Sequence, residues 1–195
     1  MRNLRFKYLS LSIMTLLFAI TATAQNVYKL NAKNSSLTVT GTSSLDDWEL
    51  KATGLGAETG LKLKGSVVSE IEYVKFTSPV KGLKSDKNNM RRKARKALKR
   101  RKFPQIKFTM KGDEPHTVSG KNADITGMLT VAGKTKEIIA PVDFTVSSDR
   151  QFTVSGKVRL KMSDFGIDPP TAFFGTLKTG DEVEVKYNLE FTKVN

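Results

Sequence analysis

Cysteine is absent from the chain, and histidine occurs only once among its 195 residues. A chain without cysteine forms no disulfide, so the fold must be stable without one. His116 alone cannot make a conventional zinc site, which needs several histidine, cysteine or carboxylate ligands. Glycine-rich phosphate loops, Walker patterns and a nucleophile elbow are missing as well. We therefore predict that the protein is not an enzyme and has no cofactor, while an enzyme acting on a bound quinone or lipid stays an open alternative.

Long hydrophobic runs are also scarce, and the one at the N-terminus covers only residues 9–20. It follows three cations and precedes a small-x-small sequence ending at Ala24, which is the pattern of a cleaved export signal. A membrane-spanning helix needs roughly 20 apolar residues. We therefore predict a signal peptide over residues 1–24, a single mature domain over residues 25–195, and a periplasmic or secreted location.

Most of the mature chain alternates apolar and polar residues with period two, which is the pattern of half-buried strands. The alternating segments are residues 28–30, 37–39, 61–73, 106–110, 125–131, 142–146, 152–162 and 183–191. About eight short strands with turn-rich links indicate an antiparallel sandwich or barrel. Along 61–73 the alternation predicts that Val67, Ser69, Ile71 and Tyr73 share one face.

Glycines interrupt the inward-facing positions of these strands. Gly65, Gly127 and Gly156 either shape the bends that a closed barrel needs or contribute to a cavity. Gly133-Lys134 is predicted to form a tight turn between two strands. Together these features favour the barrel over the sandwich.

Residues 88–102 break the strand pattern and predict a helix, a lid or buttress beside the barrel. Its apolar residues fall on one face at helical spacing: Met90, Ala94, Ala97 and Leu98. Ser85 or Asp86 would cap its start. Phe103-Pro104 would end it, because the residue before a proline is pushed out of helical geometry.

Acidic residues are outnumbered, with 19 Asp and Glu against 33 Lys and Arg and a formal net charge of +14. The excess is concentrated in residues 84–102, where eleven cations accompany Asp86 as the one acid. A charge of this size attracts anionic partners without specifying which. Phosphate head groups, an anionic membrane surface or an acidic polymer would each compensate it, and a merely solvated face is the alternative. Export argues against a nucleic-acid partner.

Aromatic residues gather in a second irregular stretch, at Phe165 and at Phe173-Phe174. Two adjacent phenylalanines in an extended loop cannot both face the core. They either line the mouth of a ligand site or pack beneath a long loop.

Several short motifs in a fixed order resemble the YceI-like family of exported, lipocalin-like proteins. The resemblance covers nearly all of the mature chain. It rests on Tyr28-x-Leu30, Val39-Thr40-Gly41-Thr42-Ser43 with Asp47-Trp48, Phe103-Pro104-x-Ile106-x-Phe108, Gly127-x-Leu129-Thr130-Val131-x-Gly133-x-Thr135-Lys136, Met162-Ser163-Asp164-Phe165-Gly166-Ile167 and Gly180-Asp181-x-Val183. Similar sequences commonly carry a histidine just before the Asp-Trp pair, where this chain has Asp46.

The resemblance implies an all-β fold, an eight-stranded antiparallel lipocalin-like barrel with one flanking basic helix. It also implies an elongated apolar pocket for an isoprenoid-type or quinone-like lipid. Alternation and family position together predict the pocket residues Phe108, Leu129, Phe144, Leu160, Phe165, Phe173 and Phe174. A phosphate-bearing head group would meet Lys96, Lys99 and Arg100. The alternative function is an envelope protein that binds polyanions through residues 84–102, and the sequence leaves the oligomeric state open, a homodimer included.

Overall fold

The computed structural model describes residues 26–172 and 177–194 as a strand-rich chain with one α-helix. The predicted signal peptide lies outside the described residues. The elements are β1 (Val27–Leu30), β2 (Ser36–Ser43), β3 (Trp48–Ala52), β4 (Gly56–Lys64), β5 (Val67–Pro79), η1 (Val80–Gly82), β6 (Leu83–Lys84), α1 (Asn88–Ala97), β7 (Gln105–Met110), β8 (His116–Thr117), β9 (Asn122–Val131), β10 (Lys134–Ser148), β11 (Gln151–Lys161), η2 (Ser163–Phe165), β12 (Thr171–Ala172) and β13 (Leu177–Lys193).

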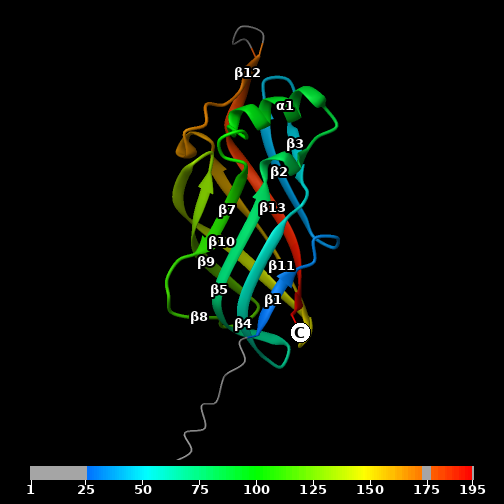
Figure 1. Cartoon of the computed structure of the whole chain (residues 1–195), viewed down its shortest axis with the longest axis vertical. Helices are drawn as coiled ribbons and strands as arrows, with labels where there is room; N and C mark the ends of the chain where they lie inside the picture. Colours follow the sequence, from blue (N-terminus) through cyan, green and yellow to red (C-terminus); the bar gives the residue numbers. More distant parts are fainter. Residues whose placement is uncertain (1–25, 173–176, 195) are drawn as a thin grey trace, which may run out of the picture.

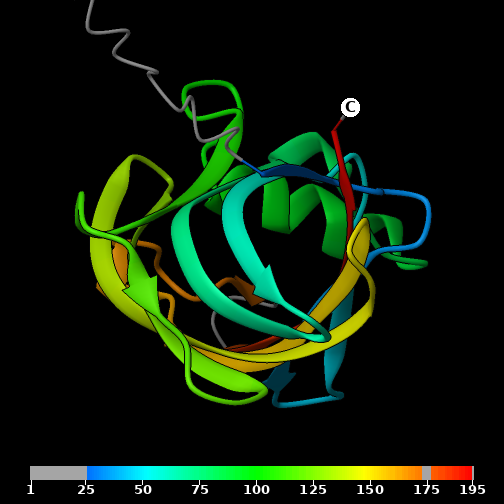
Figure 2. The ribbon, with the colours of Figure 1, turned by 90° about the horizontal axis from the view of Figure 1, so that it is seen from below.

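Eight antiparallel strands form a closed ring in the order β1-β4-β5-β7-β9-β10-β11-β13. The ring closes because β13 pairs with β1 as well as with β11, and Figure 2 shows it from one end. Nearer to α1, β13 pairs with β2 instead, β2 pairs with β3, and β3 pairs with β6. The prediction of an eight-stranded antiparallel barrel with one basic helix is therefore confirmed.

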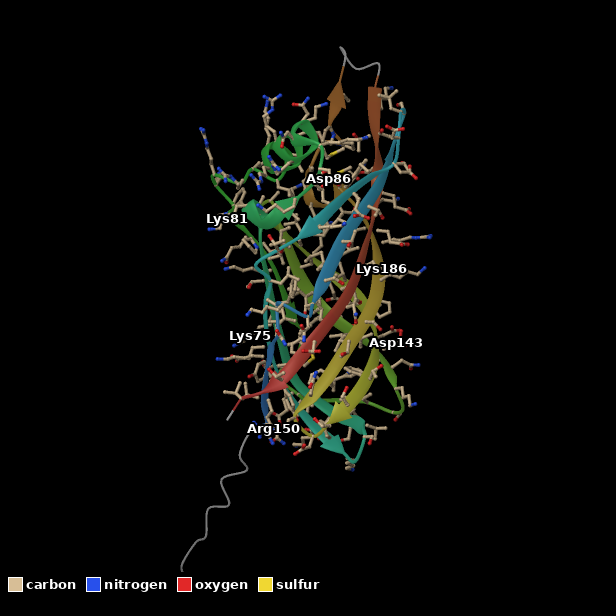
Figure 3. The ribbon with its side chains drawn as sticks, turned by 90° about the vertical axis from the view of Figure 1, so that its right-hand side faces the viewer. Lys75, Lys81, Asp86, Asp143, Arg150 and Lys186 are labelled. Carbon is tan, nitrogen blue, oxygen red and sulfur yellow. The ribbon has the colours of Figure 1, made fainter. Side chains whose placement is uncertain are left out.

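The alternation predicted from the sequence sets the two faces of the long strands. In β9, Ile125, Leu129 and Val131 are buried inside the barrel, whereas Asp124 and Met128 are exposed. Charged side chains project outward along the wall, as Figure 3 shows for Lys75, Lys186 and Asp143. The wall thus separates an apolar interior from a charged outer surface.

The turn between β9 and β10 lies one residue earlier than predicted. Its two residues are Ala132 and Gly133, and Lys134 already belongs to β10. Both have positive φ angles, 49° for Ala132 and 84° for Gly133, as two-residue hairpin turns of the I′ type require.

The predicted common face of β5 is wrong, because the β4–β5 pairing shifts register twice. The shifts fall between Gly60 and Leu61 and between Lys62 and Leu63. Each extra residue in β5 moves the following side chains to the opposite face. Val67 is consequently exposed while Ile71 is buried.

Two other positions of this hairpin follow from the same geometry. Tyr73 points outward, where its hydroxyl donates to Glu58 Oε1 at 2.9 Å. Gly65 is not an inward strand residue as predicted; it lies in the β4–β5 turn, with φ of 60°.

Helix α1 ends at Ala97, five residues before the predicted end, and Lys99 then takes a φ of 49°. The backbone N–H groups of Lys102 and Phe103 bond to the Lys99 carbonyl and turn the chain back. Phe103 lies against the β9–β10 turn, since a Cβ on Gly133 would come within 2.3 Å of its Cζ. Because Phe103 packs there, the chain leaves the direction of the helix before it reaches Pro104.

The predicted helix cap is also wrong. The N-cap residue is Lys87, and it makes no side-chain cap hydrogen bond. Ser85 instead accepts a hydrogen bond from the Lys87 N–H at 3.4 Å, one residue outside the helix.

The barrel end opposite α1 is filled by three aromatic rings, here called the floor cluster: Tyr28, Phe152 and Phe191. Phe152 stacks on Phe191 and meets the edge of Tyr28, with ring centroids 5.1 Å apart in both pairs. The Tyr28 hydroxyl donates to the Asp149 carbonyl at 2.8 Å. Figure 1 shows the C-terminus and β1 at this end and α1 at the other. Among the described residues, no helix has the length and apolar character needed to cross a membrane.

Candidate ligand-binding cavity

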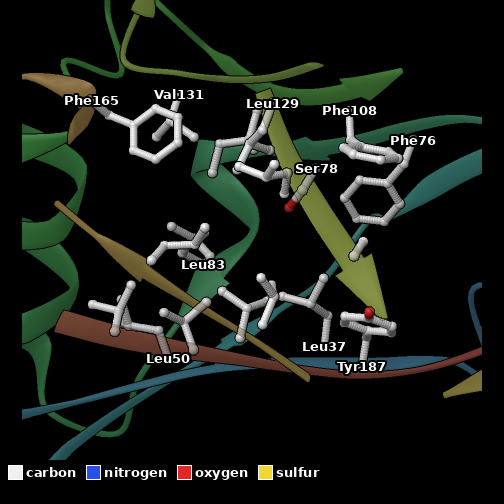
Figure 4. Close-up of a pocket in the computed structure, with 18 of the residues that line it drawn as sticks. Leu37, Leu50, Phe76, Ser78, Leu83, Phe108, Leu129, Val131, Phe165 and Tyr187 are labelled. Atoms are coloured by element: carbon white, nitrogen blue, oxygen red, sulfur yellow. The ribbon is translucent and has the colours of Figure 1, made fainter. Parts of the chain in front are cut away.

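The barrel encloses an apolar cavity of about 430 Å³. It extends from the floor cluster to the inner face of α1, and strands on all sides contribute to its wall. Figure 4 shows part of this lining, which includes Leu37, Leu50, Phe76, Leu83, Leu129 and Val131. Binding in such a space depends on the apolar area removed from water and not on directional contacts.

A glycine in β9 fixes the position of one lining ring. A Cβ on Gly127 would lie 2.3 Å from Phe108 Cζ on the neighbouring strand β7, so the ring packs directly over the glycine. Gly127 and Gly156 are not part of the cavity lining. Phe108, which packs on Gly127, and Tyr187, which packs on Gly156, are part of it. The structure therefore assigns these glycines a shaping role.

Five of the predicted pocket residues lie together in the lining: Phe108, Leu129, Phe144, Leu160 and Phe165. The first four lie at inward positions of β7, β9, β10 and β11, and Phe165 comes from η2. Phe173 and Phe174 lie outside the described residues. That these side chains contact a ligand stays a prediction.

The predicted head-group residues Lys96, Lys99 and Arg100 are exposed and do not belong to the cavity lining. The helix places Lys93 there instead, next to Met90 and Ala94. The helical spacing that grouped Met90 with Ala94 also includes position 93, so the sequence carried this signal. A head-group role for the three exposed cations stays a prediction.

The cavity reaches the surface at the helix end through a rim of mixed chemistry. Lys93, Lys161 and Lys178 contribute cations to it. Leu45, on the loop between β2 and β3, is also part of the lining and is 69 % exposed. An apolar chain can therefore enter at an end whose border is positively charged.

Arg95 holds α1 in place above the cavity. Its guanidinium donates to the carbonyls of Lys81 and of Leu83, the latter at 3.2 Å. Burial, followed by the charges of Arg91 and Arg100, lowers the pKa of Arg95. The Arg95 side chain thus connects the helix to η1 and β6 through hydrogen bonds to backbone carbonyls.

Two hydroxyls in the cavity wall are bonded to backbone carbonyls. Thr59 Oγ1 donates to the Tyr73 carbonyl at 2.7 Å, and the Tyr187 hydroxyl donates to the Pro141 carbonyl. Burial, with the nearby carboxylates of Asp143 and Asp124, raises the pKa of Tyr187 to about 12. The phenol therefore stays protonated through the physiological range.

This raised pKa predicts a loss of stability at alkaline pH. The folded phenol holds its proton more tightly than the unfolded one, whose pKa is about 10. The contribution of Tyr187 to the free energy of unfolding is fully present below pH 10 and is lost as the pH rises towards 12. In Tyr187→Phe we expect a lower Tm than wild type at pH 9 and a difference that narrows by pH 12. Tyr73, whose pKa is also raised to about 12, is present in both proteins and cancels in the comparison. A constant difference across this range would contradict the assignment.

A small closed barrel with an apolar interior open at one end is the architecture of lipocalin-type proteins. The chain belongs to the family defined by the YceI-like domain, whose model matches residues 20–191. No curated protein matches the chain.

Solved structures with the same fold are distant in sequence. Burkholderia cenocepacia BcnA is 18% identical, with a TM-score of 0.65 over 83% of this chain and 98% of that one. A polyisoprenoid binding domain from Saccharophagus degradans, implicated in plant cell wall breakdown, is 11% identical, with a TM-score of 0.67 over 87% and 100%. The Campylobacter jejuni YCEI protein is 16% identical, with a TM-score of 0.58 over 74% and 83%. At these identities the likeness concerns the fold.

Proposed function

We propose that the protein is an exported carrier or buffer that holds one elongated amphiphile, a polyisoprenoid or quinone-like lipid, inside the barrel. The observation that carries this proposal is the continuous apolar cavity of about 430 Å³, open at the helix end. The polyisoprenoid binding domain from Saccharophagus degradans, which shares the fold, supports the choice of lipid class. The N-terminal segment with the pattern of a cleaved signal supports a periplasmic or secreted location.

The energetics of the cavity suit a chain-like ligand. Each buried methylene contributes about 0.8 kcal/mol, so ten of them give about 8 kcal/mol. That is the free energy of a micromolar complex, before the loss of motional freedom is subtracted. A ligand that fills the cavity with a longer chain gains further affinity without any specific polar contact. Holding the lipid requires no catalytic group, and we propose binding in place of catalysis.

Native mass spectrometry of the mature protein, purified without detergent, tests this function. We expect a stoichiometric bound lipid that organic extraction identifies as isoprenoid or quinone. An apo mass that persists after incubation with polyprenyl lipids would overturn the proposal.

A second candidate function, attachment to an anionic membrane surface, is favoured by the unbalanced charge beside the rim. In the part of the chain that the structure describes, residues 84–102 form one ion pair, Lys87 with Asp46 at 3.4 Å. Arg91 and Arg92 bond to the side-chain amides of Asn88 and Asn89 on their own helix. Such a surface would bring the cavity opening towards the source of the lipid.

Charge reversal tests the attachment. In Lys96→Glu/Lys99→Glu/Arg100→Glu we expect at least 100-fold weaker binding to phosphatidylglycerol vesicles, because each cation contributes about 1 kcal/mol near an anionic surface. Vesicle co-sedimentation at low and high salt measures it, and binding should weaken with salt.

The matched control carries the same charge change on the barrel wall, in Lys75→Glu/Lys157→Glu/Lys186→Glu. Lys75 and Lys186 project from the wall away from α1 (Figure 3). Equal losses in the two triple variants would show a general effect of net charge, and the helix would then not be the attachment site.

A further inference from the structure

One polar atom in the cavity wall is left without a partner. Ser78 lies in β5 and is 3% exposed. Within residues 26–172 and 177–194 its hydroxyl makes no hydrogen bond. Figure 4 shows the oxygen pointing into the cavity, among Leu83, Phe108 and Leu129.

The other deep hydroxyls show that the wall can satisfy such a group. Thr59 donates to a carbonyl of the neighbouring strand β5, and Tyr187 donates across β11 to a carbonyl of β10. Ser78 is paired through its backbone with Ile106 of β7, yet its hydroxyl turns to the interior. A buried hydroxyl without a partner loses its hydration with no replacement, so it destabilises the empty protein.

A water molecule is a poor partner at this position. A buried water needs two to four polar contacts, roughly, to be held in place. Of the lining side chains that Figure 4 labels, those other than Ser78 and Tyr187 are hydrocarbon. The group best suited to Ser78 is therefore one delivered by a ligand whose remaining surface is apolar.

We propose that Ser78 binds one uncharged polar group of the ligand, a carbonyl, hydroxyl or amide, at the head of the apolar chain. This inference rests on the proposed function and narrows its ligand class. A charged phosphate would not suit the position, because a buried charge with a single hydroxyl partner is strongly disfavoured. Charged groups belong outside, at the rim with Lys93, Lys161 and Lys178.

The strand geometry gives the direction of the chain. Below Ser78, β5 contributes Phe76, Val74 and Ile71 to the lining, in order towards the floor cluster. Ile71 lies roughly 20 Å from Ser78 along the strand. The polar group is therefore held at the level of Ser78 on β5, and the tail extends down to the floor cluster.

Phytanol and phytane test the inference, because they share one branched skeleton and differ in a single hydroxyl. Native mass spectrometry of wild-type protein with an equimolar mixture should show phytanol preferred about tenfold, the effect of one hydrogen bond. In Ser78→Ala the preference should fall to within twofold, while phytane binds as well as in wild type. Thr77→Val, a control at the adjacent position of β5 that is not part of the lining and whose hydroxyl donates to the Gly56 carbonyl, should keep the preference.

The Tm of the ligand-free protein tests independently whether the Ser78 hydroxyl lacks a partner. Ser78→Ala should raise it, because the unpaired hydroxyl is removed, whereas a lower Tm would mean that the hydroxyl has a partner within the protein. Ser78→Cys, which keeps the shape but is a weak donor, should also reduce the preference. A tenfold preference retained in both variants overturns the role of Ser78 alone. Failure of wild type to bind either compound overturns the proposed function together with this inference.

Discussion

Replacing Ala140 with tryptophan should lower the affinity for a chain-like lipid several hundred-fold while the barrel still folds. Ala140 lines the cavity from β10, opposite Ile125 of β9. An indole there occupies space that the ligand would fill. A loss of about 150 Å² of ligand contact corresponds to about 4 kcal/mol. Native mass spectrometry with phytanol measures the loss, and circular dichroism checks the fold.

The adjacent residue provides the matched control. Ile139 is 56% exposed on the outer face of the same strand. Ile139→Trp adds the same bulk outside the barrel and should leave phytanol uptake unchanged. If Ala140→Trp binds phytanol as wild type does, the ligand does not occupy the interior.

The largest expected effect on stability comes from Gly156→Ala. A Cβ at this position would lie 2.2 Å from the Pro141 carbonyl oxygen and 2.7 Å from the Tyr187 hydroxyl. The first of these is backbone of the paired strand β10 and cannot rotate away. We expect a loss of about 3 kcal/mol in the free energy of unfolding, or roughly 10 °C in Tm, measured by thermal denaturation.

Gly65→Ala is the control for the intrinsic effect of alanine at a glycine. Its φ of 60° strains any side chain, but no atom lies within 4 Å of the added Cβ. The expected loss is about 1 kcal/mol, from backbone strain alone. Equal losses in the two variants would mean that the contact with Pro141 relaxes freely.

Alternation, together with the resemblance to the family, allowed much of the cavity wall to be predicted, because alternation indicates which side chains of a regular strand face inward. Phe108, Leu129 and Phe144 were found in this way, each at an inward position of a regular strand. Such strands require no knowledge of their partners, since a period of two assigns every residue to one face.

Features that depend on a neighbouring segment could not be read from local pattern. The register shifts of β5 arise in its pairing with β4, so Val67 was placed on the wrong face. The early end of α1 depends on Phe103 packing over Gly133, a residue distant in sequence. The isolation of the Ser78 hydroxyl likewise depends on which side chains surround it in space.

The barrel wall changes its construction near α1. Strands β5 and β7 are paired as far as Pro79 and Gln105, and the Val80 N–H still bonds to the Pro104 carbonyl at 2.9 Å. Beyond that point β6 pairs, within the described part of the chain, with β3 alone, and α1 packs between β6 and the side chains around Leu129. Here the wall is a seam held by packing and by the Arg95 side chain. Below the seam the ring stays closed by β5–β7 pairing, so the upper part of the wall depends on side-chain packing and the lower part on backbone hydrogen bonds.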